Sequence, residues 1–189
     1  MADAFRFEGY VIVSQDGMIA AADGTMPEAL IVPADQDFFE RGLDRTDLVV
    51  HGRHSQESHA RSAGRRRVIA THRVPSLAAG DTPHSILWNP QGTSFEEAAA
   101  ALGAGAGQVG VIGGTQVFGL FLPRYAAFHL SRVAGLRLPG GRPVFPGVPA
   151  QSPEAILRRH GYRPGPERPL DPRRGASVTT WEPEGNFAR

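Results

Sequence analysis

Short apolar runs of strand length recur along the chain, separated by polar and glycine-rich segments. Several runs are almost continuously apolar rather than alternating, which is typical of strands buried on both faces of a sheet. The predicted strands cover residues 10–14, 48–51, 67–71, 85–88, 108–112, 127–133 and 177–181.

Segments with helix-boundary signals lie between these runs. The pattern predicts helices over 35–43, after Pro33, and over 95–102, where Ser94 and Glu97 form a capping box. Further helices are predicted over 115–122 and 153–160. Strands that alternate with helices indicate an α/β fold with a largely parallel central sheet.

The C-terminal part has a different composition. Residues 163–175 are rich in Pro, Arg and Gly and are predicted to form a long surface loop. The strand over 177–181 is then expected to be antiparallel, at one edge of the sheet. The length of 189 residues suits one domain, so we expect a single domain over 1–189, and the sequence contains no internal repeat.

Composition narrows the possible chemistry. All 20 basic residues are Arg, against 19 acidic residues, which gives a formal net charge of +1. There is no Cys, which excludes disulfides, thiolate metal sites and a cysteine nucleophile, and the absence of Lys excludes Schiff-base chemistry. No charge excess attracts nucleic acid or a membrane, and the N-terminal residues resemble neither a signal peptide nor a membrane span, so a cytoplasmic location is expected.

Two glycine-rich segments lead to different predictions. Gly105, Gly107 and Gly110 spell G-x-G-x-x-G, but a helix precedes and a strand follows, the reverse of a dinucleotide-binding fingerprint. Gly113 and Gly114 instead follow a predicted strand and precede a helix, where exposed N–H groups favour an anion such as pyrophosphate.

Two basic segments also indicate possible anion-binding sites. Gly52 ends the strand over 48–51, so Arg53, His54 and Ser55 are predicted at a helix start that suits phosphate. The run 65–67 precedes another strand. We expect these positions and the Gly113 turn to line one crevice at the sheet's end.

One carboxylate stands out near the start of the helix over 35–43. Asp35, Phe38 and Phe39 have i, i+3, i+4 spacing and share a helix face. A carboxylate on an aromatic face is desolvated, its pKa rises, and it can hold a heterocycle through two parallel hydrogen bonds. Asp37 points elsewhere and is expected at the surface.

The order of several motifs over residues 9–148 resembles dihydrofolate reductase. That resemblance implies a three-layer sandwich with a mostly parallel sheet, an antiparallel C-terminal edge strand and helices on both faces, with a variant region over 149–189. The matching segments are Met26 and Pro27, 33–39, 50–55, 64–71, 112–118, 128–131 and 141–146.

The resemblance also implies a function, the NADPH-dependent reduction of a 7,8-dihydropterin, either dihydrofolate or dihydromethanopterin. Hydride would pass to C6 and a proton to N5. Asp35 would be the catalytic acid that holds the pterin. The other substrate-binding residues would be Phe39, Arg65 with Arg66 as the alternate for a tail carboxylate, Ile112, and Ser131, which would support Asp35.

NADPH would bind along the strand ends, and no metal is expected. The implied cofactor contacts are Ile12, Ile19, Met26, Gly52, Arg53, His54, Ser55, Thr71, His72, Gly113, Gly114, Thr115, Gln116, Val117 and Phe118.

Alternatives stay open at this stage. The segment 14–20 looks more like the pyrimidine reductases of riboflavin synthesis, which implies a ribosylamino-pyrimidine substrate. A nucleic-acid-binding module using Arg65, Arg66, Arg67, Arg173 and Arg174 is disfavoured by the near-zero net charge. His51 and His54 lack a third metal ligand nearby, so a solvated or phosphate-facing role is expected.

Overall fold

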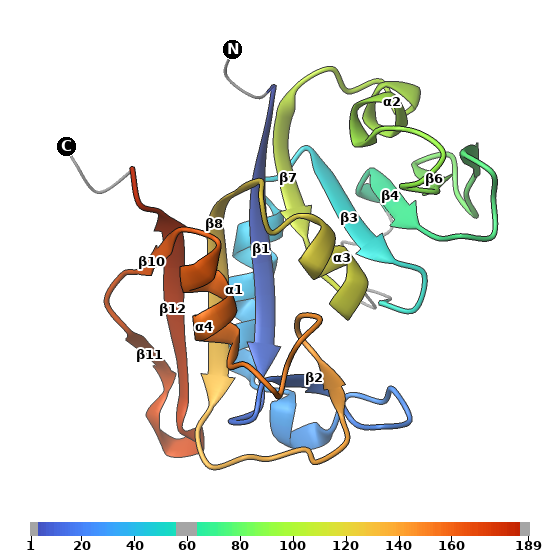
Figure 1. Cartoon of the computed structure of the whole chain (residues 1–189). Coiled ribbons are helices and arrows are strands. Elements are labelled where there is room, and N and C mark those ends of the chain that lie inside the picture. Colours follow the sequence, from blue (N-terminus) through green and yellow to red (C-terminus); the bar gives the residue numbers. More distant parts are fainter. Residues whose placement is uncertain (1–3, 56–63, 186–189) are drawn as a thin grey trace.

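The computed structural model describes residues 4–55 and 64–185. It contains a central sheet with helices on both sides (Figure 1). The strands are β1 (Phe5–Val13), β2 (Met18–Ala20), β3 (Leu48–Gly52), β4 (Arg67–Ala70), β5 (Leu77–Ala79), β6 (Ser85–Trp88), β7 (Gly107–Val111), β8 (Tyr125–Val133), β9 (Arg142–Pro143), β10 (Tyr162–Pro164), β11 (Arg168–Asp171) and β12 (Ala176–Pro183). The helices are α1 (Pro33–Leu43), α2 (Phe95–Ala101), α3 (Thr115–Leu120) and α4 (Pro153–Arg159), with short 3-10 helices η1 (Glu28–Leu30) and η3 (Pro172–Arg174).

The large sheet has the order β10-β12-β8-β1-β7-β3-β4-β6-β5, with β11 also paired to β12. The six strands from β8 to β6 are all parallel, whereas β5, β10, β11 and β12 pair antiparallel. The predicted α/β class with a mostly parallel sheet is therefore confirmed.

Helices α2 and α4 start where capping chemistry predicts. Ser94 and Glu97 form the reciprocal capping box of α2, and the Ser152 hydroxyl accepts the Ala155 N–H at 3.1 Å to open α4. Helix α1 begins at Pro33, two residues earlier than predicted, because proline is well suited to the first helical turn.

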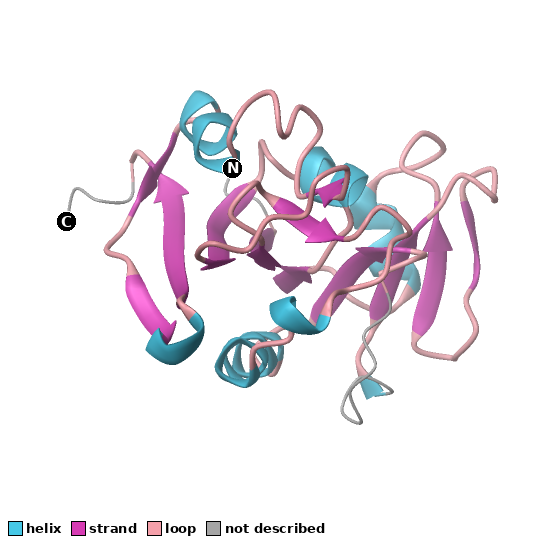
Figure 2. Cartoon of the chain, turned by 90° about the horizontal axis from the view of Figure 1, so that it is seen from below, coloured by secondary structure: helices cyan, strands magenta, loops and turns pink. Residues whose placement is uncertain are grey.

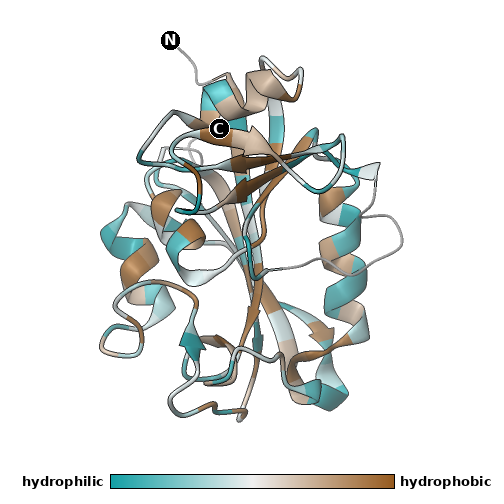
Figure 3. Ribbon diagram, turned by 90° about the vertical axis from the view of Figure 1, so that its right-hand side faces the viewer, coloured by the Kyte–Doolittle hydropathy of each residue, from teal (hydrophilic) through white to brown (hydrophobic). Residues whose placement is uncertain are grey.

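Each face of the sheet has its own apolar layer. Helix α1 covers one face, where Leu43 packs with Tyr10 and Val49. Helices α2, α3 and α4 contribute to the larger core on the other face, so the molecule has three layers (Figure 3). Among the described residues, no helix has the length and apolar character needed to cross a membrane.

The C-terminal part differs from the prediction of a long loop over 163–175. Strands β10 and β11 fall in this segment and pair in succession with the outer side of β12, so β12 is antiparallel as predicted but is not itself the outermost strand. Pro164 and Pro169 are tolerated because an edge strand does not need every N–H in a ladder. The proline-rich composition of this segment suggested a loop, but it did not reveal that β10 and β11 pair with β12 at the edge of the sheet.

Candidate active site

Asp35 with Ser131 and the Gly52 and Gly113 turns lie toward the carboxyl ends of the parallel strands. Strands β1, β3, β4, β7 and β8 all run in the same direction, so their carboxyl ends meet at the edge seen in Figure 2. Strands β1 and β8 extend past the others: Val111 pairs with Gly9, whereas Ser131 pairs with Ile12. Ser131 therefore lies three residues, about 10 Å, farther along β1 than the end of β7.

Asp35 is positioned by the first turn of α1, and its side chain is directed at β8. The residue is 8% exposed, and its carboxylate is hydrogen-bonded to Ser131, which is 2% exposed. Burial raises the pKa of Asp35 to about 6, and the Ser131 hydrogen bond offsets only part of this effect. A carboxylate that ionises near neutral pH and has one fixed partner retains acceptor capacity for a ligand.

The two strand-to-helix junctions at the ends of β3 and β7 are in direct contact. The Gly52 N–H donates to the Gly113 carbonyl at 2.6 Å. Gly113 has φ +119°, and a Cβ built there would lie 3.1 Å from the Phe118 ring and 3.5 Å from the Ser55 Oγ. A Cβ on Gly114 would lie 3.4 Å from the same hydroxyl. The positive φ and the tight Phe118 contact therefore favour glycine at 113, whereas a Cβ on Gly114 would make an ordinary contact with Ser55.

The remaining predicted cofactor residues differ in exposure and in their neighbours. Thr71, at the end of β4, and Val117, in α3, are buried, and Ile19 approaches Gly114 from β2. The exposed members are Met26, Arg53, His54, His72 and Gln116. Ile12 packs with Leu30 and Val32. Ile112 and Phe39 are half-buried and pack with Tyr10 and Leu43 on the α1 face, and Thr115 hydrogen-bonds the Pro143 carbonyl.

Phe118 belongs to the core rather than to an open surface. Its side chain is 1% exposed and packs edge-on against Phe128 and Phe145. Only its contact with the Gly113 turn links it to the junction.

The prediction of one crevice that includes residues 65–67 is wrong. Arg67 pairs with Val49, near the start of β3, so this basic run lies at the amino edge, opposite Gly52 and Gly113. Arg65 reaches the α1 face, where it bonds Glu40 and Asp44 at 2.9 Å each. Arg66 instead donates to the Leu102 carbonyl at 3.4 Å. Residues 65–67 precede β4, whereas Gly52 ends β3, and in a parallel sheet residues before and after a strand lie at opposite edges.

The predicted role of His51 is also wrong. The side chain is 3% exposed, so it is neither solvated nor free to face a phosphate at the surface. Its Nδ1 lies 2.9 Å from the Gly52 carbonyl, and Nε2 has no hydrogen-bond partner in the described structure. Burial lowers the pKa of His51, which favours the neutral imidazole. His54 is exposed, as expected for the residue after the strand end.

Comparisons with known proteins give matches in structure only. No protein-family model matches the chain, and no curated protein matches its sequence. A protein assigned to riboflavin biosynthesis from Shewanella sp. PV-4 superposes with a TM-score of 0.64 at 18% identity, over 94% of this chain and 98% of that one. Dihydrofolate reductase from Enterococcus faecalis, solved in complex with NADP(H) and RAB-propyl, gives a TM-score of 0.62 at 16% identity, over 95% of this chain and 96% of that one. The chain has the dihydrofolate reductase fold.

A third neighbour with this fold is a two-activity protein. The diaminohydroxyphosphoribosylaminopyrimidine deaminase/5-amino-6-(5-phosphoribosylamino)uracil reductase from Thermotoga maritima gives a TM-score of 0.61 at 16% identity. The match covers 94% of this chain but only 56% of that protein. At these identities the comparison establishes the dihydrofolate reductase fold and leaves the substrate open.

Sequence reasoning missed a buried polar cluster beneath α1. Tyr10 donates to Glu8 at 2.7 Å, and His129 Nε2 lies 3.4 Å from the same carboxylate. Burial alone would raise the pKa of Glu8, but hydrogen bonds from His129, Tyr10 and Arg6 outweigh it and lower this pKa to about 2. The only sequence signal was a lone acidic residue within the apolar strand β1, which the predicted strand, starting at residue 10, did not include.

Proposed function

We propose that this chain is an NADPH-dependent reductase of a 7,8-dihydropterin. The observation that carries the proposal is Asp35, a buried carboxyl group held by Ser131 at the carboxyl edge of the sheet. No other buried carboxyl group in the described chain combines a raised pKa with a place at this edge.

Asp35 has the properties needed to hold a pterin. An aminopterin presents an amino group beside a ring N–H, and a carboxylate accepts both through two parallel hydrogen bonds. Ser131 fixes the carboxylate on β8, which limits the loss of side-chain freedom on binding. With a pKa near 6, the group is ionised at neutral pH yet close enough to protonation to support proton transfer toward N5.

The junction of Gly52, Ser55, Gly113 and Gly114 fits a dinucleotide phosphate. Its three glycines have no Cβ atoms, the Ser55 hydroxyl lies against Gly113 and Gly114, and the exposed Arg53 is adjacent. NADPH, when bound, would supply the hydride. The protein would orient it through these residues and Thr71, while Met26, which is 48% exposed on the loop after β2, is free to close over the ring.

The tail of the substrate is a separate question. Arg65 on the α1 face is held by Glu40 and Asp44, so a tail carboxylate would have to displace one of them. This arrangement favours a substrate whose tail makes little use of an arginine fork, and dihydromethanopterin has a different tail from dihydrofolate.

A second candidate function is the reduction of a ribosylamino-pyrimidine. Segment 14–20 supports it: the buried Ser14 hydroxyl accepts the Met18 N–H at 3.0 Å and donates to Asp16 at 2.6 Å, which fixes the turn into β2 beside Gly114. One neighbour in structure is named for riboflavin biosynthesis, and another is named as a 5-amino-6-(5-phosphoribosylamino)uracil reductase. An aminopterin ring accounts better for the buried carboxyl group of Asp35.

Steady-state NADPH oxidation distinguishes these possibilities. Purified protein is assayed with dihydrofolate, dihydromethanopterin and the ribosylamino-pyrimidine, each with NADPH and with NADH. The proposal predicts turnover of a dihydropterin and a preference for NADPH. Turnover of the pyrimidine alone would replace the proposal with the second candidate, and no oxidation with any substrate would refute both.

A further inference from the structure

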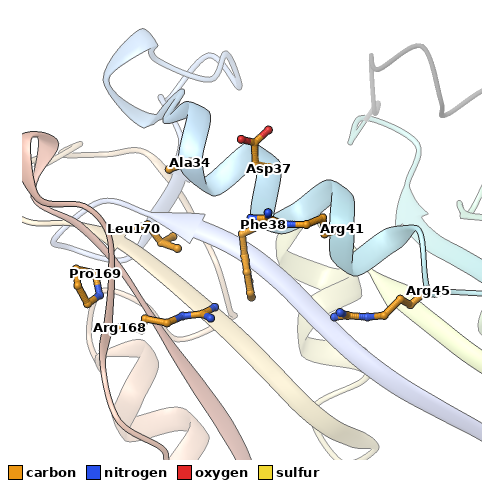
Figure 4. A pocket seen from close by; sticks show the side chains of 8 residues that line it. All are labelled: Ala34, Asp37, Phe38, Arg41, Arg45, Arg168, Pro169 and Leu170. Atoms are coloured by element: carbon orange, nitrogen blue, oxygen red, sulfur yellow. The ribbon is translucent and has the colours of Figure 1, made fainter.

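The outer flank of α1 carries a cavity that the proposed reaction does not use. It has a volume of about 490 Å³ and lies between α1 and β11 (Figure 4). That volume is in the range of small-molecule sites. Its lining residues are Ala34, Asp37, Phe38, Arg41, Arg45, Arg168, Pro169 and Leu170.

Three of the lining side chains are arginines that form no ion pair with any residue that the structure describes. Within residues 4–55 and 64–185, no ion pair is formed by Arg41, Arg45 or Arg168. By contrast, Arg132 pairs with Glu154 and Arg163 with Glu184 elsewhere on the molecule. Three unpaired cations around one cavity repel each other, and an anion would relieve that repulsion.

The arginines are positioned by contacts that leave their charge available. Arg168, on β11, lies over the Phe38 ring with its guanidinium carbon 5.2 Å from the ring centroid. Arg45 is hydrogen-bonded to the Tyr10 hydroxyl. In Figure 4 the guanidinium groups of Arg45 and Arg168 point into the space beneath Phe38 from opposite sides. These contacts orient the two forks without neutralising them.

The acidic residue at the cavity does not cancel this charge. Asp37 is the sole carboxylate in the lining, so three arginines leave a formal charge of +2. Figure 4 shows its oxygens directed away from Arg45 and Arg168. The site is therefore electropositive, with apolar walls from Ala34, Phe38 and Leu170.

The cavity is separate from the proposed active site. The lining includes Asp37, Phe38 and Arg41 of α1 but not Asp35, whose carboxylate is directed at Ser131 on β8. Phe39 and Leu43 face β3 and Ile112, whereas the cavity faces β11. A ligand here would not contact Asp35 directly.

We propose that this cavity binds a small organic anion carrying two or more phosphate or carboxylate groups. Its volume exceeds the need of one oxyanion, and guanidinium forks bind both groups in bidentate fashion. The site goes beyond the reductase activity and does not depend on it.

Calorimetry at low ionic strength tests the proposal with tripolyphosphate, citrate and orthophosphate as probes. Tripolyphosphate or citrate should bind at least about 10-fold more tightly than orthophosphate. The double variant Arg41→Gln/Arg168→Gln should weaken that binding at least about 10-fold. Asp37→Asn should tighten it by roughly 3-fold, a gain that a folding defect does not mimic. Whichever of the two probes binds more tightly identifies the oxyanion class.

Two controls assign the binding to this cavity. Arg159→Gln removes an exposed charge from α4 and should change affinity less than about 2-fold, since it lies outside the site. Arg53→Gln, at the proposed nucleotide junction, reports any binding of the phosphate probes there instead of in the cavity. Loss of binding in Arg53→Gln but not in the double variant, or equal binding of all three anions, would overturn the proposal. Tighter binding of a single-stranded oligonucleotide than of tripolyphosphate would overturn the assignment to a small molecule.

Discussion

Two carboxyl groups on the α1 face of the sheet, Asp35 and Glu8, have pKa values that their surroundings shift in opposite directions. Asp35 has one hydrogen-bond partner, Ser131, and burial raises its pKa to about 6. Glu8 has three partners, and its pKa is lowered to about 2. Burial opposes ionisation in both cases, so the number of donors decides the direction. Only Asp35 is left with capacity for a ligand.

Asp35→Asn is expected to stabilise the fold at high pH. The pKa of Asp35 in the folded state lies above the usual 3.8, so ionisation of this carboxyl group destabilises the fold. This cost is absent below about pH 3.8, grows between pH 3.8 and 6, and is complete above about pH 6. The neutral amide avoids a cost of about 2–3 kcal/mol. Denaturant unfolding at pH 8 should show this gain, and at pH 3.5 the two proteins should be alike.

Asp37→Asn is the matched control on the same helix, because Asp37 is exposed. Its stability should stay within about 0.5 kcal/mol of the parent at both pH values. A gain at pH 8 in both variants would show that surface charge, rather than burial of Asp35, is responsible.

Glu8→Gln should have the reverse pH dependence. The lowered pKa of Glu8 means that its ionised form stabilises the fold above about pH 4.5, and this contribution disappears as pH falls toward 2. The variant should lose about 2–3 kcal/mol at pH 7, and the deficit should shrink in acid. Unfolding at pH 7 and pH 3, with the exposed Glu28→Gln as control, measures this. A pH-independent deficit would contradict the account.

Among single residues, the sequence predicted best where local spacing decides the outcome. The i, i+3, i+4 pattern of Asp35, Phe38 and Phe39 correctly indicated a buried carboxylate on a partly buried aromatic face. The partners of Arg65 could not be predicted, because Glu40 and Asp44 reach it only after α1 packs on the sheet. The burial of His51 likewise depends on strands that are distant in sequence.

At the scale of elements, helix α1 is held close to the sheet by a glycine. A Cβ on Gly42 would lie 2.4 Å from the Tyr10 ring, so the helix sits directly on β1. Alanine normally stabilises a helix relative to glycine by about 1 kcal/mol. Here we expect Gly42→Ala to destabilise by about 1–3 kcal/mol because the methyl group overpacks the contact.

Gly105→Ala is the control for that prediction, since a Cβ there meets nothing within 4 Å. Chemical denaturation of both variants gives the comparison. Equal stability of the two would show that α1 does not depend on close contact with Tyr10.

The sequence predicted elements well where capping and buried apolar runs are strong. It found each of the four helices and the long strands, but it missed β2, β5 and β9, which are two or three residues long. It also assigned β10 and β11 to a loop, because their pairing with β12 depends on tertiary contacts and not on local propensity.

Across the whole molecule, the variant C-terminal part is tied into the rest of the fold. Strand β12 pairs with β8, and Trp181 on it is 2% exposed in the main core. Arg174 in η3 donates to the Ile31 carbonyl at 2.6 Å, which links this region to the chain that enters α1. We therefore expect residues from both parts to unfold together.

Trp181→Ala tests this integration. Loss of the buried indole should cost about 3–5 kcal/mol, in a single transition seen by all probes. Trp181→Phe should cost much less, because Nε1 has no hydrogen-bond partner within the described chain. A separate early transition, or a loss below about 1 kcal/mol for Trp181→Ala, would show an independent C-terminal unit.

The most direct test of the central claim is the single-turnover rate of dihydropterin reduction by Asp35→Asn, followed through NADPH absorbance with the substrate that the parent protein turns over. If Asp35 holds the ring and promotes protonation at N5, the rate should fall by about two orders of magnitude or more, while NADPH affinity stays close to that of the parent. A near-parental rate in a correctly folded variant would contradict the account.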